Sequence, residues 1–453
     1  MVAADTIVAT ATPYGVSGIA VVRLSGPAAQ TITSALCTPE NGAAPTLPPR
    51  TAVLTVVHNQ GIALDEVVIT YFKAPGSYTG EDVVEIACHG SPVIVESIIA
   101  ETCRLGARIA DPGEFTRRAF LNGKLDLVQA ESVAGLIQSK SVESSQLNLR
   151  LLRGQLSERL FDLRDKIISL LTEVEFELDF SEDELNPDLL PRAKNILNAL
   201  VKNFQTLIDS YQQGKLLSRG ANVVIIGAPN VGKSTLLNAL TNSDRAIVSA
   251  TPGTTRDTID YPLILAGVPI NLVDTAGLQQ STEEIELEGI RRTHIRIEAA
   301  DLLLAVYEPP GFNQSFDFNY RPSVPLLNVY NKIDTLSTDK RRNLPTDDEG
   351  QLYISAKTGD GLDRLKTRIK SAMQISSSTS DELMLTSARQ FQALSVCESN
   401  LKQATVLLQS PAVAFELVSV ELREAIDAID RLLGKTTADD IINNIFSNFC
   451  VGK

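Results

Sequence analysis

Short apolar runs rich in β-branched residues alternate with helical stretches over the first 120 residues. The runs at 6–11, 18–24, 67–72 and 83–87 are typical of strands, whereas 92–105 has helical spacing. This alternation predicts a domain of mixed strands and helices over residues 1–120.

From residue 121 the pattern becomes helical. Leucine, isoleucine and valine recur at mostly three- and four-residue steps between 147 and 178. That stripe predicts one helix of roughly 30 residues, about 45 Å long. Helical spacing resumes between 388 and 433, beyond a serine-rich linker at 376–380. The simplest architecture is one α-helical domain in two parts, 121–219 and 375–453, with a separate domain inserted at 220–374.

The segment Gly-Ala-Pro-Asn-Val-Gly-Lys-Ser-Thr at 227–235 lies between a predicted buried strand, 221–226, and leucines with helical spacing. In this context the backbone N–H groups of the loop and of the helix N-terminus point at phosphate oxygens. Lys233 can reach the outer phosphates, and the Ser234 hydroxyl can bind magnesium. A chance glycine-rich turn of this form is expected in about one chain per hundred. The flanking strand and helix argue against chance.

Three further motifs each follow a predicted strand: Asp274-Thr275-Ala276-Gly277, Asn331-Lys332-Ile333-Asp334 and Ser355-Ala356-Lys357. The first can hold magnesium through water and offer a backbone N–H to the γ-phosphate. The carboxylate of Asp334 can accept hydrogen bonds from N1–H and N2–H₂ of guanine, a donor pair that adenine lacks. The order of the motifs predicts a Ras-like α/β domain that binds GTP.

The hydrolytic residues are less clear from the pattern. Leu278 stands where many small GTPases place the glutamine that orients the attacking water. Another group must do so, and acidic residues follow at 283, 284, 286 and 288, although most of such a stretch is ordinarily solvated surface. Arg256 or a bound metal ion could supply the further cation. Thr255 has the position of a mobile-loop threonine that closes on magnesium.

Composition limits the remaining alternatives. The 453 residues suffice for about three domains, and no apolar run approaches the ~18 residues of a membrane span. No signal or transit peptide pattern precedes Arg23, so a cytoplasmic protein without a membrane segment is expected. Five cysteines without Cys-x-x-Cys pairing and three histidines argue against a zinc site. The net charge of −14 is unfavourable for a nucleic-acid binder without excluding one.

Three other segments remain open to interpretation. The turn-rich loop 74–82 ends in two carboxylates, and a plain connector is favoured over a binding loop. A modest basic patch is more often solvated surface than a binding site. The tail at 449–453 has a terminal lysine that argues against prenylation, and its apolar character suggests that it docks. The basic patch comprises Arg104, Arg108, Arg117, Arg118 and Lys124.

The segments 23–26, 78–82 and 122–127, the inserted GTPase and the tail Phe-Cys-Val-Gly-Lys together resemble the MnmE family, also called TrmE. The resemblance implies an N-terminal α+β folate-binding-like domain that binds a tetrahydrofolate derivative, 5-formyl or 5,10-methylene, and mediates homodimerisation. It also implies a heterotetramer with the FAD-containing partner MnmG. That complex adds an aminomethyl-type (carboxymethylaminomethyl) group to C5 of the wobble uridine of certain tRNAs.

The resemblance also implies roles for individual residues. Arg23, Glu81, Lys124 and Lys453 would hold the folate, and Glu286 would be the catalytic residue that positions water. Potassium would be bound by Asn230 and by the carbonyls of Ser249, Thr251 and Thr254, and magnesium by Ser234 and Thr255. The whole GTP-binding set is Asn230, Val231, Gly232, Lys233, Ser234, Thr235, Ser249, Ala250, Thr251, Pro252, Gly253, Thr254, Thr255, Asp274, Thr275, Ala276, Gly277, Asn331, Lys332, Asp334, Ser355, Ala356 and Lys357.

Two alternatives come from other classes of protein. A ribosome-assembly GTPase would share the nucleotide motifs but would not explain Arg23, Glu81 and Lys453. A folate-dependent aminomethyl carrier would explain the first domain but not the GTPase. Neither the nitrogen source, glycine or ammonium, nor a role for Cys450 follows from the sequence.

Overall fold

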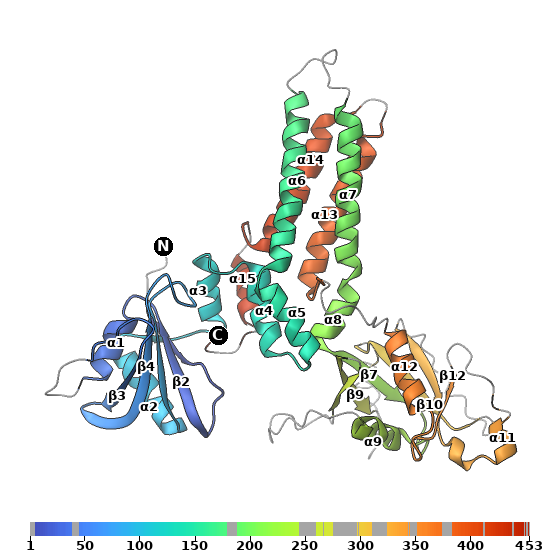
Figure 1. Ribbon diagram of the computed structural model, residues 1–453, viewed down its shortest axis with the longest axis horizontal. Helices are drawn as coiled ribbons and strands as arrows, with labels where there is room; N and C mark the ends of the chain where they lie inside the picture. Colours follow the sequence, from blue (N-terminus) through green and yellow to red (C-terminus); the bar gives the residue numbers. More distant parts are fainter. Residues whose placement is uncertain are drawn as a thin grey trace, which may run out of the picture. The chain divides into compact units, whose positions relative to one another are not determined.

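A computed structural model describes residues 5–38, 45–178, 188–243, 260–265, 267–274, 297, 299–309, 324–342, 344, 351–373, 383–410, 413–436, 439–447, 449 and 452. The chain forms two compact units, one of residues 1–134, 151–197 and 399–453, the other of 135–150 and 198–398 (Figure 1). Both units are therefore built from segments far apart in the sequence.

The N-terminal part holds a six-stranded sheet in the order β3-β4-β5-β2-β1-β6. All neighbouring strands are antiparallel except β1 and β6. Helices α1 and α2 pack on one face, over the alternate residues of each strand that point inward. The elements are β1 (Ile7–Thr10), β2 (Ser17–Ser25), α1 (Ala29–Leu36), β3 (Ala52–Asn59), β4 (Ile62–Phe72), β5 (Val83–Gly90), α2 (Pro92–Arg104), β6 (Arg108–Ile109) and α3 (Glu114–Leu121).

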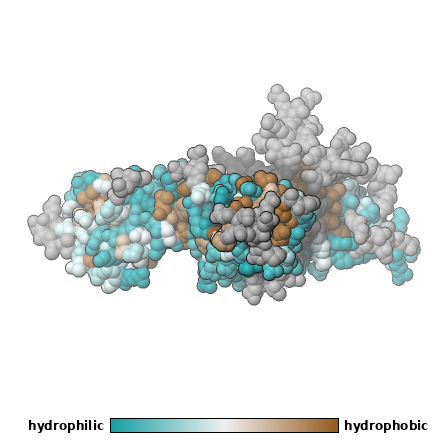
Figure 2. Space-filling view, turned by 90° about the horizontal axis from the view of Figure 1, so that it is seen from above, coloured by the Kyte–Doolittle hydropathy of each residue, from teal (hydrophilic) through white to brown (hydrophobic). Residues whose placement is uncertain are grey.

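The surface of this part is mixed. Figure 2 shows hydrophilic residues with apolar ones scattered among them. Large exposed apolar side chains include Val16, Ile19, Leu54 and Ile62. Isolated apolar residues are ordinary on protein surfaces and indicate no binding site by themselves.

The helical elements come from two distant parts of the sequence. Helices α6 and α14 lie side by side (Figure 1), with Arg164 donating to both oxygens of Asp430 at 2.7 and 2.8 Å. None of the described helices is both long and apolar enough to cross a bilayer. The bounds are α4 (Leu127–Ile137), α5 (Val142–Leu152), α6 (Gln155–Leu178), α7 (Leu189–Asp209), α8 (Tyr211–Arg219), α13 (Ala388–Leu407), α14 (Phe415–Leu433) and α15 (Asp439–Ser447).

The single helix predicted from the stripe at 147–178 is wrong. Helix α5 ends at Leu152, and α6 begins at Gln155. Between them Gly154 has φ +85°, a left-handed conformation that ends a helix and suits glycine. The side chain of Gln129 donates to the Leu152 carbonyl at 3.0 Å and thereby caps the end of α5. An apolar stripe can continue across such a break because both helices bury their leucines.

The inserted domain has a six-stranded sheet in the order β12-β11-β10-β7-β9-β8, parallel except for β8. Its strands are short and almost wholly apolar, as expected for strands covered on both faces. The elements are β7 (Ala221–Ile226), α9 (Lys233–Ser243), β8 (Asp260–Leu265), β9 (Val268–Asp274), β10 (Leu302–Tyr307), β11 (Leu326–Tyr330), η3 (Ile333–Thr335), α11 (Thr338–Arg342), β12 (Gln351–Tyr353) and α12 (Leu362–Ala372). This multidomain architecture confirms the predicted fold class.

Candidate functional site

The loop between β7 and α9 has the strand–loop–helix geometry expected of a phosphate-binding loop. β7 is almost entirely buried, and the helix begins at Lys233. Gly232 has φ +93°, and a Cβ there would collide with the side-chain amide of Asn331. The Lys233 ammonium is buried and donates to the carbonyls of Gly227 and Ala228, each at 2.8 Å. Glycine at this position is therefore explained by the backbone conformation and by a neighbouring side chain.

Two consecutive residues, Asn331 and Lys332, hold the other side of this loop. The buried Asn331 amide donates to the carbonyls of Val231 at 3.0 Å and Gly232 at 3.5 Å. Its oxygen accepts from the backbone N–H of Ala356 at 2.9 Å. The Lys332 ammonium donates to the Asn230 carbonyl. Asn331 thus joins the phosphate loop to the Ser-Ala-Lys segment.

The two remaining parts of the predicted guanine pocket also meet. Ser355 is buried, and its hydroxyl donates to Asp334 Oδ1 at 2.7 Å. The same hydroxyl accepts from the Thr358 N–H at 3.2 Å. The second carboxylate oxygen of Asp334 stays available as an acceptor, and the side chain is half-buried. Both properties suit a carboxylate that accepts hydrogen bonds from the edge of a base. Lys357 is exposed.

The other predicted nucleotide residues divide into two groups. Asp274 ends β9 and lies in register with Ile225 of β7, so its backbone is at the same sheet edge as the phosphate loop. Ser234 and Thr235 lie in the first turn of α9. The remainder lies outside the described residues: Ser249, Ala250, Thr251, Pro252, Gly253, Thr254, Thr255, Arg256, Thr275, Ala276, Gly277, Leu278 and Glu286.

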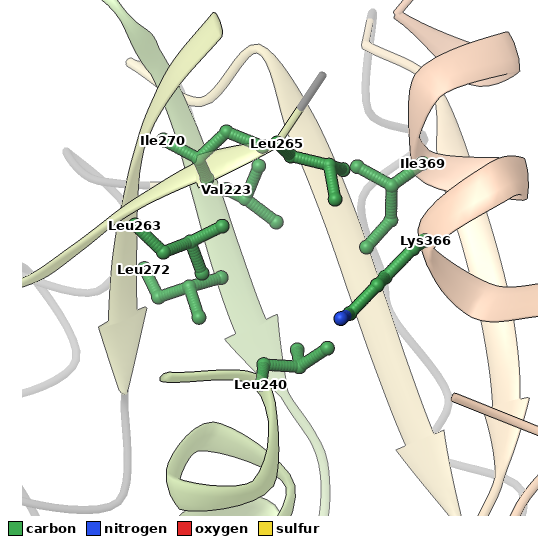
Figure 3. Close-up of a pocket in the computed structure, with 8 residues that line it drawn as sticks. All are labelled: Val223, Leu240, Leu263, Leu265, Ile270, Leu272, Lys366 and Ile369. Carbon is green, nitrogen blue, oxygen red and sulfur yellow. The ribbon is translucent and has the colours of Figure 1, made fainter. Parts of the chain in front are cut away.

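A cavity in the same domain is unrelated to these motifs. It measures about 10 Å³, roughly one water molecule, and is lined by side chains from β7, β8, β9, α9 and α12. Figure 3 shows aliphatic side chains around it, with the Lys366 amine as the one nitrogen among the labelled residues. This is a packing space in the core and not a nucleotide site.

In the N-terminal part, Arg23 is the centre of a second cluster. Arg23 and Glu85 are cross-strand partners on β2 and β5, and the guanidinium donates twice to Glu85 Oε1, at 2.9 and 2.7 Å. The same guanidinium lies 5.8 and 5.7 Å from the ring centres of Tyr78 and Phe115. It also donates to the Gly452 carbonyl at 3.3 Å.

The two described residues of the C-terminal tail, Phe449 and Gly452, are buried, which agrees with the predicted docking. Gly452 is buried with φ +93°, and a Cβ there would collide with the Thr10 carbonyl of β1. Phe449 is buried and packs with Phe446, ring centres 5.4 Å apart. Lys453 and Cys450 lie outside the described residues.

Glu81 is paired with Arg118 and not with Arg23. It accepts from Arg118 Nη1 at 3.1 and 3.3 Å and from the Ser25 hydroxyl at 2.7 Å. Arg118 also donates to Asp5 Oδ1 at 2.6 Å and Glu114 Oε1 at 2.9 Å. The Arg118 side chain is only 11% exposed. The interpretation of this basic patch as solvated surface is wrong for Arg118.

The charges in this cluster shift one another's titration. Burial opposes the charge of Asp5, but hydrogen bonds from Arg108 and Arg118 outweigh it and hold the pKa of Asp5 below its ordinary value. The pKa of Glu114 is also lowered. Burial opposes its charge, but it accepts hydrogen bonds from Arg108, the Asp111 N–H and Arg118, and these outweigh the effect of burial. We call Asp5, Glu81, Arg108, Glu114 and Arg118 the Arg118 network.

The three described residues predicted to hold folate all touch the loop 74–82. Arg23 lies over Tyr78, Glu81 belongs to the loop, and the Lys124 ammonium donates to the Pro75 carbonyl at 3.1 Å. The Asn122 amide donates to the Thr79 carbonyl at 2.7 Å. This loop is thus fixed by side chains from two other segments.

Four residues in these two sites were missed by sequence reasoning: Glu85, Arg118 as an ion-pair centre, Gly452 and Glu308. Glu308 follows β10 and accepts from the Lys332 ammonium at 2.8 Å. Strand alternation could have paired Arg23 with Glu85 once the register was known. Helical i,i+4 spacing could have paired Arg118 with Glu114, whereas the other partners of Arg118, Gly452 and Glu308 have no local signal.

Comparison with known proteins gives two family matches. The family "GTP-binding protein TrmE N-terminus" matches residues 6–124, and "MnmE helical domain" matches residues 127–450. The chain is 38% identical to a tRNA modification GTPase MnmE from Cytophaga hutchinsonii, over 99% of this chain and 98% of that protein. It is 40% identical to one from Azoarcus sp., over 99% and 98%.

A solved structure of the G domain of the T. maritima FeoB iron transporter is 24% identical and covers 34% of this chain and 98% of that one. Its TM-score is 0.23, too low to support an inference.

Proposed function

This chain belongs to the MnmE family of tRNA modification GTPases, and from that membership we propose a potassium-dependent GTP hydrolase that works in the cytoplasm with the FAD-containing partner MnmG. The product is an aminomethyl-type (carboxymethylaminomethyl) group on C5 of the tRNA wobble uridine, and a tetrahydrofolate derivative is the one-carbon donor. The observation that carries the GTP-binding part is the meeting of Asn331 with both the phosphate loop and the Ser-Ala-Lys segment.

The proposed domain limits are those of the sequence pattern. Residues 1–120 bind folate and dimerise, 220–374 bind GTP, and 121–219 and 375–453 form the helical domain. Homodimerisation through the first domain and a heterotetramer with MnmG follow from the same family membership.

In the GTPase domain the chain's own groups bind each part of the nucleotide. When GTP binds, the Lys233 ammonium donates its hydrogen bonds to phosphate oxygens in place of the carbonyls of Gly227 and Ala228. Asp334, oriented by the Ser355 hydroxyl, accepts from the guanine edge. Ser234 and Thr255 would hold magnesium, which would neutralise charge on the phosphates.

Leu278 cannot orient water, and the resemblance to the MnmE family gives that role to Glu286. Asn230 and the carbonyls of Ser249, Thr251 and Thr254 would hold potassium, which would supply the positive charge that an arginine finger supplies elsewhere. Arg256 is the alternative source of positive charge. In the N-terminal domain, Arg23, Glu81, Lys124 and Lys453 bind the folate.

The first test compares GTP hydrolysis in potassium and sodium buffers. We expect strong stimulation by potassium alone, and about 100-fold slower turnover in Glu286→Ala with GTP affinity unchanged. Asn230→Ala should abolish the potassium dependence. Equal rates in the two buffers would contradict the potassium mechanism and favour Arg256.

The second test concerns the biological substrate. Wobble nucleosides of tRNA from cells lacking this gene should lose the modification at C5 of uridine. An unchanged nucleoside profile would exclude the tRNA function while leaving the GTPase activity intact.

The third test concerns the folate site. Removing residues 449–453 should weaken formyl-tetrahydrofolate binding in calorimetry and spare GTP binding. Unchanged folate affinity would remove Lys453 from the site.

A further inference from the structure

A carboxylate that no nucleotide motif contains pairs with a lysine that holds the phosphate loop. Asn331 and Lys332 bind the carbonyls of the consecutive loop residues 230, 231 and 232. Lys332 makes a second hydrogen bond, to Glu308 Oε1 at 2.8 Å. Its ammonium therefore lies between Glu308 and the loop.

The sheet fixes the separation of Glu308 and Lys332. Tyr307 and Tyr330, which end β10 and β11, are register partners, and their rings stack with centres 5.5 Å apart. The ladder continues one residue further, with the Asn331 N–H donating to the Tyr307 carbonyl at 2.8 Å. The backbone of Glu308 is therefore held in place by the hydrogen-bonded end of β10 directly before it.

Asn230, at the far end of this chain of contacts, has φ +66°, an unusual conformation for a residue other than glycine. The Lys332 ammonium donates to its carbonyl and is one contact that holds this peptide in place. The orientation of that peptide also sets the direction of the Asn230 side chain.

We propose that Glu308 is a positioning residue for the GTPase reaction, which acts through Lys332 to hold the Asn230 peptide and so shapes the phosphate and potassium sites. The potassium part rests on the function proposed above. Glu308 itself touches neither nucleotide nor metal in this scheme.

Two effects of removing the Glu308 charge oppose each other at the phosphate site. Loss of a negative charge favours a bound anion, whereas a loosened loop releases it. Both partners of the ion pair are about one-third exposed, 34% for Lys332 and 32% for Glu308, so solvent screens the first effect. We therefore expect loosening to dominate.

The experiment measures release of a fluorescent GDP analogue from the full chain in sodium buffer. Glu308→Gln should release it about five-fold faster, and Glu308→Asp should restore most of the difference. In a Lys332→Met background, Glu308→Gln should have no further effect, because the carboxylate acts through Lys332. Unchanged or slower release, or full additivity with Lys332→Met, would overturn the proposal.

Asp301→Asn is the matched control. Asp301, in the GTPase domain, pairs with Lys215 of α8 at 3.5 Å, and their side chains are 21% and 35% exposed. Its carboxylate also accepts from the Asn222 N–H at 2.9 Å, at the start of β7 and away from the phosphate loop. Its substitution should leave GDP release unchanged.

Potassium titration of GTP hydrolysis provides the readout that a merely structural role would not move. The potassium concentration for half-maximal rate should rise about five-fold in Glu308→Gln at saturating GTP, and an unchanged value would limit Glu308 to the phosphates and overturn its effect on the metal site. If the unsubstituted protein shows no potassium preference, the proposed potassium mechanism fails, whereas GDP release still decides the role of Glu308.

Discussion

The phosphate loop and the Arg118 network each contain a cation with little solvent exposure, but the partners differ in kind. Lys233 donates to two backbone carbonyls five and six residues before it. Arg118 binds carboxylates from segments 37 and 113 residues away. Carbonyls carry no net charge, so a phosphate can replace them, whereas carboxylates already compensate the charge of Arg118. The first arrangement suits a ligand site and the second holds a fold together.

The partners of Arg23 are intermediate between those of Lys233 and those of Arg118. It is paired with Glu85, but it also lies against two aromatic rings and the Gly452 carbonyl. Within the described part of the chain it has one carboxylate partner where Arg118 has three. This difference makes Arg23 the better candidate for binding an anionic ligand, and Arg118 the residue that fixes the surrounding loop.

The largest expected effect is on the Arg118 network. Arg118→Ala leaves three carboxylates without their common partner and should cost about 3 kcal/mol of local stability. Amide hydrogen exchange of β1 and β2 in the full chain would measure it. Arg104→Ala is the control, because Arg104 is 57% exposed and its ion pair is with Glu101 one turn earlier in the same helix, so a much smaller loss of stability is expected. Equal effects would remove the distinction between the two kinds of arginine.

Asn331→Ala tests the nucleotide side of the comparison. It removes hydrogen bonds to Val231, Gly232 and Ala356 and should weaken GDP binding about 100-fold, or about 2.7 kcal/mol. Asn271→Ala is matched to it, since that amide donates at 3.3 Å to Asn222 in the same domain. Calorimetry should show GDP affinity within about two-fold of the unsubstituted chain for the control. Hydrogen exchange in the Arg118 network should be unchanged by Asn331→Ala.

Gly452→Ala tests whether the tail belongs with Arg23. The added Cβ meets the Thr10 carbonyl in a left-handed backbone, so about 2 kcal/mol is expected, with faster exchange at Thr10 and Ala11. Gly106→Ala separates the cost of the backbone conformation from the cost of the collision. Gly106 has φ +111°, but a Cβ there would meet no described atom within 4 Å. It should cost about 1 kcal/mol. A cost for Gly452→Ala no larger than for Gly106→Ala would show that the tail is not tightly docked.

The smallest effect concerns pH. Asp5 and Glu114 have pKa values lowered from 3.8 and 4.5, so their ion pairs stabilise the fold fully above those values. The stabilisation is lost as the pH falls below 4.5 and through the lower pKa values of the folded state. The double variant Asp5→Asn, Glu114→Gln should flatten this acid dependence of exchange in β1, and lower the melting temperature at pH 7 by about 3 °C. A steep acid dependence in the variant would assign it to other carboxyls.

The phosphate loop and the Arg118 network also differ in how well they could be predicted from the sequence. The nucleotide motifs are contiguous, and each follows an apolar strand, so their convergence at one sheet edge could be predicted from sequence. The multidomain fold and its inserted GTPase could be predicted for the same reason. Arg118 gathers partners at 5, 81 and 114, and of these only Glu114, four residues earlier on α3, could be found from helical spacing.

Two further features escaped prediction for physical reasons. The break at Gly154 leaves the leucine stripe intact, because α5 and α6 bury the same kind of residue on either side. Glu308 acts through a register between β10 and β11, and a register is a property of the sheet and not of either strand.

The contact between Arg23 and Gly452 joins residues 429 positions apart. At about 5–20 residues per second, a ribosome needs roughly 20–90 s to travel between them. The first domain therefore emerges long before the peptide that covers Thr10, and α6 likewise waits for α14. During synthesis the GTPase domain can fold before the first domain and the helical domain are complete, because each of these needs residues that follow the GTPase domain in the sequence.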